Sequence, residues 1–177
     1  MDLQKKAELI VNEYEFEEIL NSFGEAHIVG NVALKTTVKP DIDFQIYAKK
    51  ENFQLLANKI MEKLLELKPN TIESHKLAQS DKYLVTATFI ENKIIWTLDI
   101  SLTEPNKDYL KDAYRFYVDF NSKLNDTNRS IIKKLKLDFL KQNRLKNSMA
   151  YYIYRAVIDE GATTSNDVLK YINKIRK

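Results

Sequence analysis

Apolar residues recur at helical spacing in the first part of the chain. Over residues 2–22 this stripe predicts one helix or a pair of short helices. The apolar run of residues 26–29 follows and predicts a short strand that Gly30 stops. Asn31 is a competent N-cap, so we expect two turns of helix over residues 32–38 before a Lys-Pro break.

Two later segments alternate between polar and apolar positions, as strands do. Residues 41–47 place their apolar side chains on one face and Asp41 and Asp43 on the other. Residues 93–102 repeat the arrangement, with Asp99 opposite their apolar face. Because residues 82–90 precede them after a two-residue break, the pair predicts a β-hairpin of antiparallel strands.

The remaining segments are helical in pattern, apart from an apparent loop that contains His75. The expected helices are residues 51–67, 108–121, 129–146, 148–160 and 165–175. A series of strands and helices followed only by helices predicts an α/β layer with a helical appendage. We therefore expect one domain over residues 1–104 and a helical domain over residues 105–177.

The composition excludes several kinds of chemistry. The 177 residues include no Cys, two His and three Gly. Disulfide scaffolds, thiolate zinc sites and cysteine nucleophiles are therefore ruled out. Neither the P-loop nor the GxGxxG pattern occurs. Catalysis by this chain would depend on carboxylates, Lys and Arg side chains, hydroxyls or backbone groups.

Charge and hydropathy limit the binding partners and the cellular location that we expect. The formal net charge of +3 is too small to indicate nucleic-acid binding by itself, although it is compatible with small anionic ligands. No stretch approaches the roughly 20 apolar residues of a membrane span, and the N-terminus lacks the continuous apolar core of a signal peptide. We expect a cytoplasmic protein without membrane contact.

The three aspartates are the strongest candidates for chemistry. Residues i and i+2 of a strand point the same way about 7 Å apart, so Asp41 and Asp43 can converge on one ion or a bridged pair of ions. If Asp99 lies on the same side, three carboxylates meet. Such a group repels itself unless hard cations such as Mg²⁺ neutralise it. The alternative is that each aspartate is a solvent-facing residue of an amphipathic strand.

The surrounding residues resemble a family. Residues 27–34 (HIVGNVAL) and 40–44 (PDIDF) are similar to the signature of the DNA polymerase β superfamily of nucleotidyltransferases. That signature is an apolar strand, Gly-Ser, a short helix, Asp-x-Asp, and a third carboxylate on a later strand, where Asp99 stands. The resemblance covers about residues 20–104. It implies an α+β fold, in which a mixed sheet with flanking helices is followed by a C-terminal helical bundle, as in small antibiotic and minimal nucleotidyltransferases.

The resemblance also implies roles for particular residues. Gly30 and Asn31 would hold the β and γ phosphates of a nucleoside triphosphate. Asp41 and Asp43 would ligate two Mg²⁺ ions. Asp99 would ligate the catalytic ion and accept the proton of an acceptor hydroxyl. The family usually has Ser in place of Asn31; Asn keeps the capping and hydrogen-bonding capacity, but the change is also what a non-catalytic member would show.

One basic residue beside this segment has a candidate role of its own. Lys39 follows the expected short helix and is placed to neutralise triphosphate charge. We therefore group Lys39 with Gly30 and Asn31 as candidate nucleotide-binding residues.

Together these features predict a Mg²⁺-dependent nucleotidyltransferase. It would move a nucleoside monophosphate from an NTP, expected to be ATP, to a hydroxyl of a small molecule such as an aminoglycoside or lincosamide-type antibiotic. Nucleic acid is a less expected partner because the chain is short and its charge modest. An oligomer is compatible with the sequence.

Two other functions are kept open. One is a catalytically weak nucleotidyltransferase-like binding module that acts as an antitoxin or regulatory partner. The other is a glycosyltransferase that uses Asp-x-Asp to bind its metal; it ranks third because the chain offers no domain of the size that a sugar nucleotide requires.

Overall fold

The computed structural model describes residues 2–77, 82–105, 112–145 and 149–175. These residues form two compact units, Met1–Asp119 and Phe120–Lys177. The division lies inside a helix and later in the chain than the boundary that we expected after residue 104. Because the positions of the two units relative to one another are not determined, each unit is described by itself.

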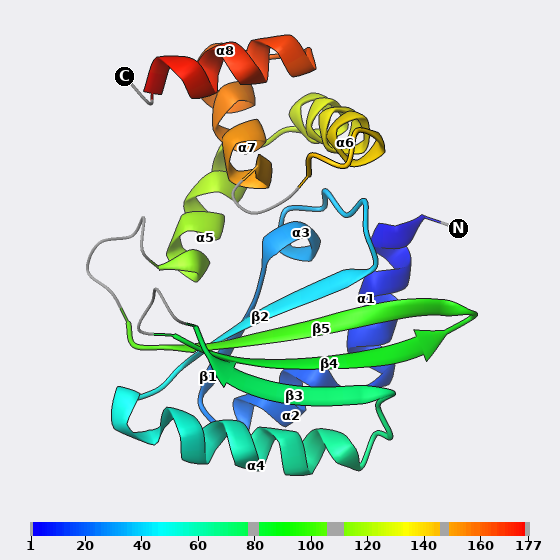
Figure 1. Ribbon diagram of the computed structural model, residues 1–177, viewed down its shortest axis with the longest axis vertical. Coiled ribbons are helices and arrows are strands. Elements are labelled where there is room, and N and C mark those ends of the chain that lie inside the picture. The colour runs from blue at the N-terminus through cyan, green and yellow to red at the C-terminus, as the bar shows by residue number, and fades with distance from the viewer. Residues whose placement is uncertain (1, 78–81, 106–111, 146–148, 176–177) are drawn as a thin grey trace. The chain divides into compact units, whose positions relative to one another are not determined.

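The strands found among the described residues of the first unit form one mixed sheet with the order β1-β2-β5-β4-β3 (Figure 1). They are β1 (Glu25–Val29), β2 (Asp41–Tyr47), β3 (Thr71–Lys76), β4 (Tyr83–Glu91) and β5 (Ile94–Thr103). Only β2 and β5 pair in parallel; the other neighbours are antiparallel. The alternation of residues 41–47 and the hairpin of β4 and β5 are therefore as predicted.

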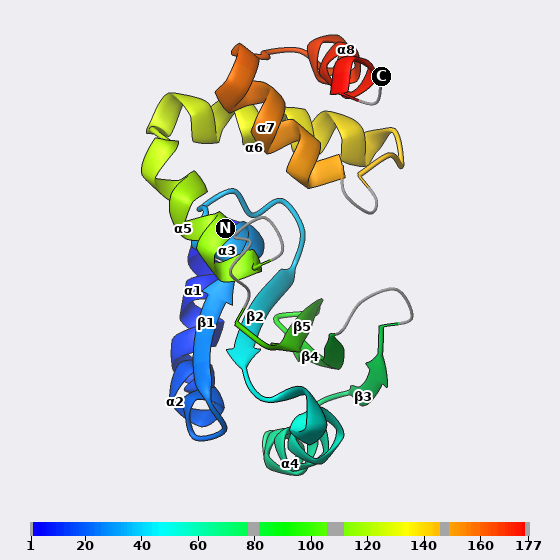
Figure 2. The same cartoon turned by 90° about the vertical axis from the view of Figure 1, so that its left-hand side faces the viewer.

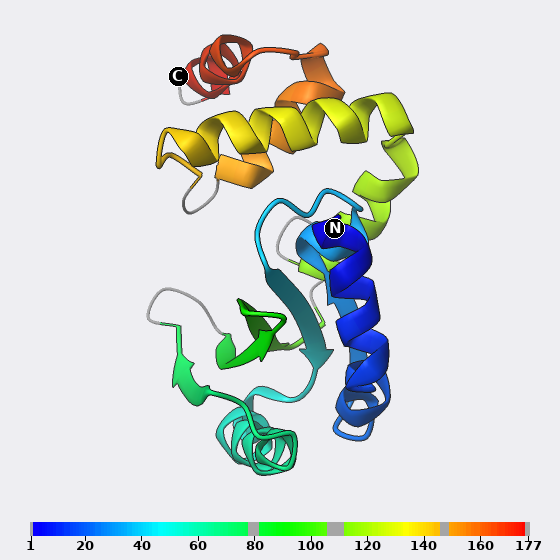
Figure 3. The same cartoon turned by 90° about the vertical axis from the view of Figure 1, so that its right-hand side faces the viewer.

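Helices cover one face of this sheet. They are α1 (Leu3–Glu13), α2 (Phe16–Asn21) and α4 (Phe53–Leu65), which a 3₁₀ turn, η1 (Lys50–Asn52), precedes. Helix α2 lies beside β1, α1 contacts α2 and α3, and α4 lies beside β3 and β4 (Figure 2, Figure 3). Their apolar stripes meet buried strand residues such as Phe44, Trp96 and Ile100 in one core. The opposite face carries the polar positions of β2 and β5, and we call it the open face.

Two local expectations were wrong. The helix expected over residues 32–38 is a single turn, α3 (Gly30–Ala33), with Val29 rather than Asn31 at its N-cap. It stops early because Lys35 adopts a left-handed backbone (φ +56°) that a helix does not tolerate. The apparent loop around His75 is β3, an exposed edge strand whose side chains offer little apolar alternation to detect.

Helices make up the described part of the second unit. The element α5 (Ala113–Lys123) crosses the division, and α6 (Asp126–Lys141), α7 (Met149–Glu160) and α8 (Ser165–Ile175) follow. Residues 106–111, where the first of these helices was expected to begin, lie outside the described residues. Buried Leu135, Ile153 and Val168 come from α6, α7 and α8 in turn, which gives this unit its own core. No described helix is both long and apolar enough to span a membrane.

Candidate functional site

The register of β2 and β5 brings the aspartates of the two strands together. Asp43 is the direct neighbour of Asp99 in the parallel pair, and Asp41 is the neighbour of Thr97. Residues paired in this way share a face of the sheet. The residues next to these aspartates along the two strands are buried on the helix-covered face. They are Ile42 and Phe44 on β2 and Leu98 and Ile100 on β5. All three aspartates therefore lie on the open face.

Gly30 packs closely against one member of this group. It has a left-handed backbone with φ +68°, which glycine adopts without steric cost. A Cβ built on Gly30 would overlap the carboxylate of Asp43, with the carboxylate carbon 2.9 Å away. The backbone at the end of β1 is thus packed against Asp43, and only glycine leaves the carboxylate in place.

Asp41 has two polar neighbours from the segment before it. The side-chain amide of Asn31 donates to both carboxylate oxygens at 3.3 Å. The ammonium of Lys39 lies 3.7 Å from Oδ2. The sequence predicted that Asn31 would cap the following helix. Asn31 holds the Asp41 carboxylate instead. Lys39 also lies against that carboxylate, with its side chain 42% exposed.

Asp99 is oriented by a neighbour that the sequence did not single out. Thr86 on β4 is the cross-strand partner of Asp99, and its hydroxyl donates to Asp99 Oδ1 at 2.7 Å. A hydrogen bond to one oxygen fixes the rotation of the carboxylate. Asp99 is thus held between Thr86 on one side and Asp43 on the other.

The carboxylates of Asp41, Asp43 and Asp99 are of a chemical type that binds hard cations. Three carboxylates on one face are oxygen ligands of the kind that Mg²⁺ takes. Among the residues that the structure describes, however, no three His, Asp or Glu side chains converge closely enough to hold a metal ion as they lie. Metal binding at these carboxylates would therefore require their side chains to move from the positions described.

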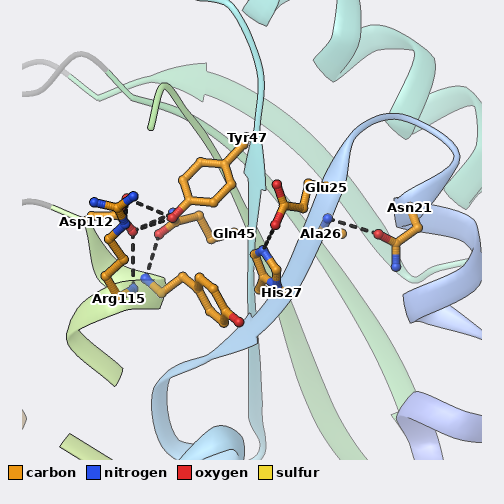
Figure 4. Close-up of polar contacts among 9 residues, drawn as sticks. Asn21, Glu25, Ala26, His27, Gln45, Tyr47, Asp112 and Arg115 are labelled. Carbon is orange, nitrogen blue, oxygen red and sulfur yellow. Dashed lines mark hydrogen bonds and ion pairs between the residues drawn. The ribbon is translucent and has the colours of Figure 1, made fainter. Parts of the chain in front are cut away.

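A buried network ties the start of α5 to the same strand. The side chain of Asp112 is fully buried and accepts hydrogen bonds from the Tyr47 hydroxyl at 2.7 Å and the Gln45 amide at 3.1 Å (Figure 4). Asp112 also accepts from the backbone N–H of Arg115, as an N-cap does. In turn, the backbone N–H of Tyr114 donates to Gln45. The first turn of α5 is thereby fixed to β2.

Aromatic groups of α5 come close to the site as a result. The rings of Tyr114 and His27 stack with centroids 3.5 Å apart. Burial, followed by the negative charges of Asp43 and Asp41, raises the pKa of Tyr117 far above its usual range. The phenol of Tyr117 is therefore neutral at any physiological pH and lies within the electrostatic reach of the two carboxylates.

Sequence reasoning missed Thr86, Gln45 and Asp112. Thr86 stands on the polar face of its strand, a signal that identifies its face but not its cross-strand partner. Gln45 follows the same alternation as Asp41 and Asp43. Asp112 lies inside the segment expected to be helical from residue 108, which hid its role as a cap.

Asp41 and Asp43 lie on a strand that pairs in parallel with the strand of Asp99, and Gly30 begins the single helical turn that follows β1. This is the arrangement that the resemblance to a nucleotidyltransferase fold implied. Solved structures agree. The Cid1 poly(U) polymerase bound to MgGTP matches with a TM-score of 0.59 and 14% identity over 89% of this chain. The complex of the non-canonical poly(A) polymerase GLD-2 with GLD-3 matches with a TM-score of 0.56 and 18% identity.

These likenesses establish the fold. The chain spans about half of each of those proteins, 50% of the Cid1 chain and 55% of the GLD-2 complex chain. No protein-family model matches the chain, and no curated protein matches it either.

Proposed function

We propose that the chain is a Mg²⁺-dependent nucleotidyltransferase that transfers a nucleoside monophosphate from an NTP, with ATP as the expected donor. The observation that carries this proposal is the register that makes Asp43 and Asp99 direct neighbours, with Asp41 on the same face. Carboxylates gathered on one face, with glycine backbone against one of them, suit a metal-bound triphosphate.

The candidate site residues have different roles in the proposed reaction. Asp41, Asp43 and Asp99 would hold two Mg²⁺ ions, which supply Lewis-acid stabilisation of the attacking and leaving oxygens. Gly30 and Asn31 bind the β and γ phosphates through N–H groups, and Lys39 neutralises their charge. Because α3 is one turn long, these N–H groups matter more than any helix dipole.

The transfer step conserves atoms and charge. The acceptor oxygen forms a bond to the α-phosphorus, the bond from that phosphorus to the bridging oxygen breaks, and pyrophosphate leaves. Asp99 takes the acceptor proton. Thr86 donates a hydrogen bond to Oδ1 of Asp99, so we assign proton acceptance to Oδ2.

We propose a small hydroxylated molecule as acceptor, with an aminoglycoside or lincosamide-type antibiotic as a candidate, and a cytoplasmic setting. The net charge of +3 supports this choice over a nucleic acid because polyanions bind through many cations. RNA is the competing acceptor, given that Cid1 and GLD-2 are named as poly(U) and poly(A) polymerases.

Titration of ATP with and without Mg²⁺ tests the proposal. The wild-type chain should bind ATP only with Mg²⁺, and Asp43→Asn should weaken that binding at least tenfold because a ligand charge is lost. Asp126→Asn is the matched control, since Asp126 is a fully exposed aspartate of α6, and it should bind as wild type. Absence of Mg²⁺-dependent binding for all four NTPs would refute the proposal.

A binding module without catalysis is the second candidate. The observation that favours it is that Asn31 and Lys39 already contact the Asp41 carboxylate, an arrangement that fills the place of a metal ion. Pyrophosphate release separates the two functions. A module binds NTP in the titration but releases no pyrophosphate with any acceptor, whereas the enzyme releases one pyrophosphate for each monophosphate transferred.

A further inference from the structure

The polar side chain of Gln4 is buried at the first turn of α1. Gln4 is 5% exposed and stands on the same side of the helix as the buried residues Ala7 and Val11. The side chain of the N-cap residue Asp2 accepts from the backbone N–H of Gln4 and fixes this turn. A buried amide costs free energy unless its hydrogen bonds are made, so the partners of Gln4 explain its position.

All the hydrogen-bonding positions of the Gln4 amide are filled. Its oxygen accepts the hydroxyl of Thr37 at 2.7 Å and the backbone N–H of Thr37 at 3.4 Å. Its nitrogen donates to the backbone carbonyl of Val32 at 3.1 Å and to the carboxylate of Glu8 at 2.9 Å. Gln4 is therefore bonded at two places to residues 30–40, which we call the connecting segment.

The connecting segment carries a candidate nucleotide-binding residue just beyond each of these two places. Val32 follows Asn31 directly, and Thr37 stands shortly before Lys39. Asn31 and Lys39 contact the same carboxylate, that of Asp41. A side chain that joins Val32 to Thr37 therefore sets how these two contacts are spaced.

Regular structure does not fix this part of the backbone. The helical turn α3 ends at Ala33, and residues 36–38 form neither helix nor strand. Helix α1, in contrast, is held in the core by Ala7 and Ile10, and it lies beside α3 (Figure 3). Gln4 thus connects a firmly packed helix to an irregular segment.

We propose that Gln4 is a positioning residue for the triphosphate, which acts through the connecting segment and does not touch the nucleotide. This proposal rests on the nucleotidyltransferase function proposed above, in which Asn31 binds the β and γ phosphates and Lys39 neutralises their charge. Without the Gln4 bonds the connecting segment shifts, and Asn31 and Lys39 lose their alignment with Asp41. Binding groups need a rigid support to keep their geometry, so the affinity for ATP falls.

Two substitutions at Thr37 test this role through a single bond. Thr37→Val removes the hydroxyl that Gln4 accepts, whereas Thr37→Ser keeps the hydroxyl and removes a buried methyl group. Each folded variant is titrated with Mg²⁺ and ATP. Thr37→Val should bind about fivefold more weakly than wild type, the equivalent of one hydrogen bond, and Thr37→Ser should bind as wild type. Urea unfolding gives the stability of both variants for comparison.

Gln4→Met is the second variant, because it keeps the length of the side chain and removes every hydrogen bond of the amide. It should weaken ATP binding at least as much as Thr37→Val does. The double variant should bind no more weakly than Gln4→Met alone, because the acceptor of the Thr37 hydroxyl is already gone. Tyr14→Phe is the matched control. It removes the hydrogen bond from Tyr14 to Glu91 at the other end of α1 and should bind ATP as wild type.

The outcomes separate this proposal from the proposed function. A wild-type chain that binds no NTP with Mg²⁺ refutes the function itself. If wild type binds ATP, equal affinity of Thr37→Val and wild type overturns the positioning role. An equal loss of affinity in Thr37→Val, Thr37→Ser and Tyr14→Phe overturns it as well, because affinity then follows stability and not the bond to Gln4. Should Gln4→Met fail to fold, the two Thr37 variants decide the question.

Discussion

Substitution of Gly30 with Ala perturbs the site through a single methyl group. Two effects are expected. The backbone at Gly30 has φ +68°, which costs a residue with Cβ about 1–2 kcal/mol of folding stability. The new Cβ also overlaps the Asp43 carboxylate. Because that carboxylate is the end of a side chain, it rotates away at little cost to stability but leaves the position beside Asp99.

Gly161→Ala separates the two effects. Gly161 has nearly the same backbone, φ +64°, but nothing lies within 4 Å of a Cβ built there. In urea unfolding both variants should lose about 1–2 kcal/mol. In titration with Mg²⁺ and ATP, Gly161→Ala should bind as wild type and Gly30→Ala at least tenfold more weakly, about 1.4 kcal/mol. Wild-type ATP binding by Gly30→Ala would refute the argument that glycine keeps Asp43 in place.

Three further predictions concern other contacts of the first unit. Asn31→Ala removes an amide that holds the neighbouring carboxylate at 3.3 Å and should weaken NTP binding, whereas Asn31→Ser, the residue that the family resemblance implies at this position, should retain it; equal binding by both variants would contradict this role. Asp112→Asn should cost about 1–3 kcal/mol of unfolding free energy, because buried Asp112 accepts the Tyr47 hydroxyl; a coupling energy near zero with Tyr47→Phe would contradict that bond. The hydrogen bond to Glu91 is the main cause that raises the pKa of Tyr14 from 10.0 to about 12. Since the folded-state pKa is the higher one, this stabilisation is fully present below pH 10.0 and is lost as the pH rises toward 12. Urea unfolding between these pH values should therefore show a smaller loss for Tyr14→Phe than for wild type.

Local patterns predicted the strands of the site and the hairpin of β4 and β5, but not the pairing of β2 with β5. The alternation in residues 41–47 identified β2 and the face that carries Asp41 and Asp43, because a half-buried strand must alternate. That β2 pairs with β5 in parallel is a tertiary fact that no local spacing contains. The register of Asp43 with Asp99 therefore came from the structure, whereas the candidates themselves came from the sequence.

The errors have physical causes of the same kind. The turn α3 ends early because Lys35 takes a left-handed backbone, which residue type alone does not indicate. The strand β3 went unrecognised because an edge strand with one exposed side carries few apolar residues. Asn31 was expected to cap a helix, but a carboxylate from the next strand provides it with a different partner.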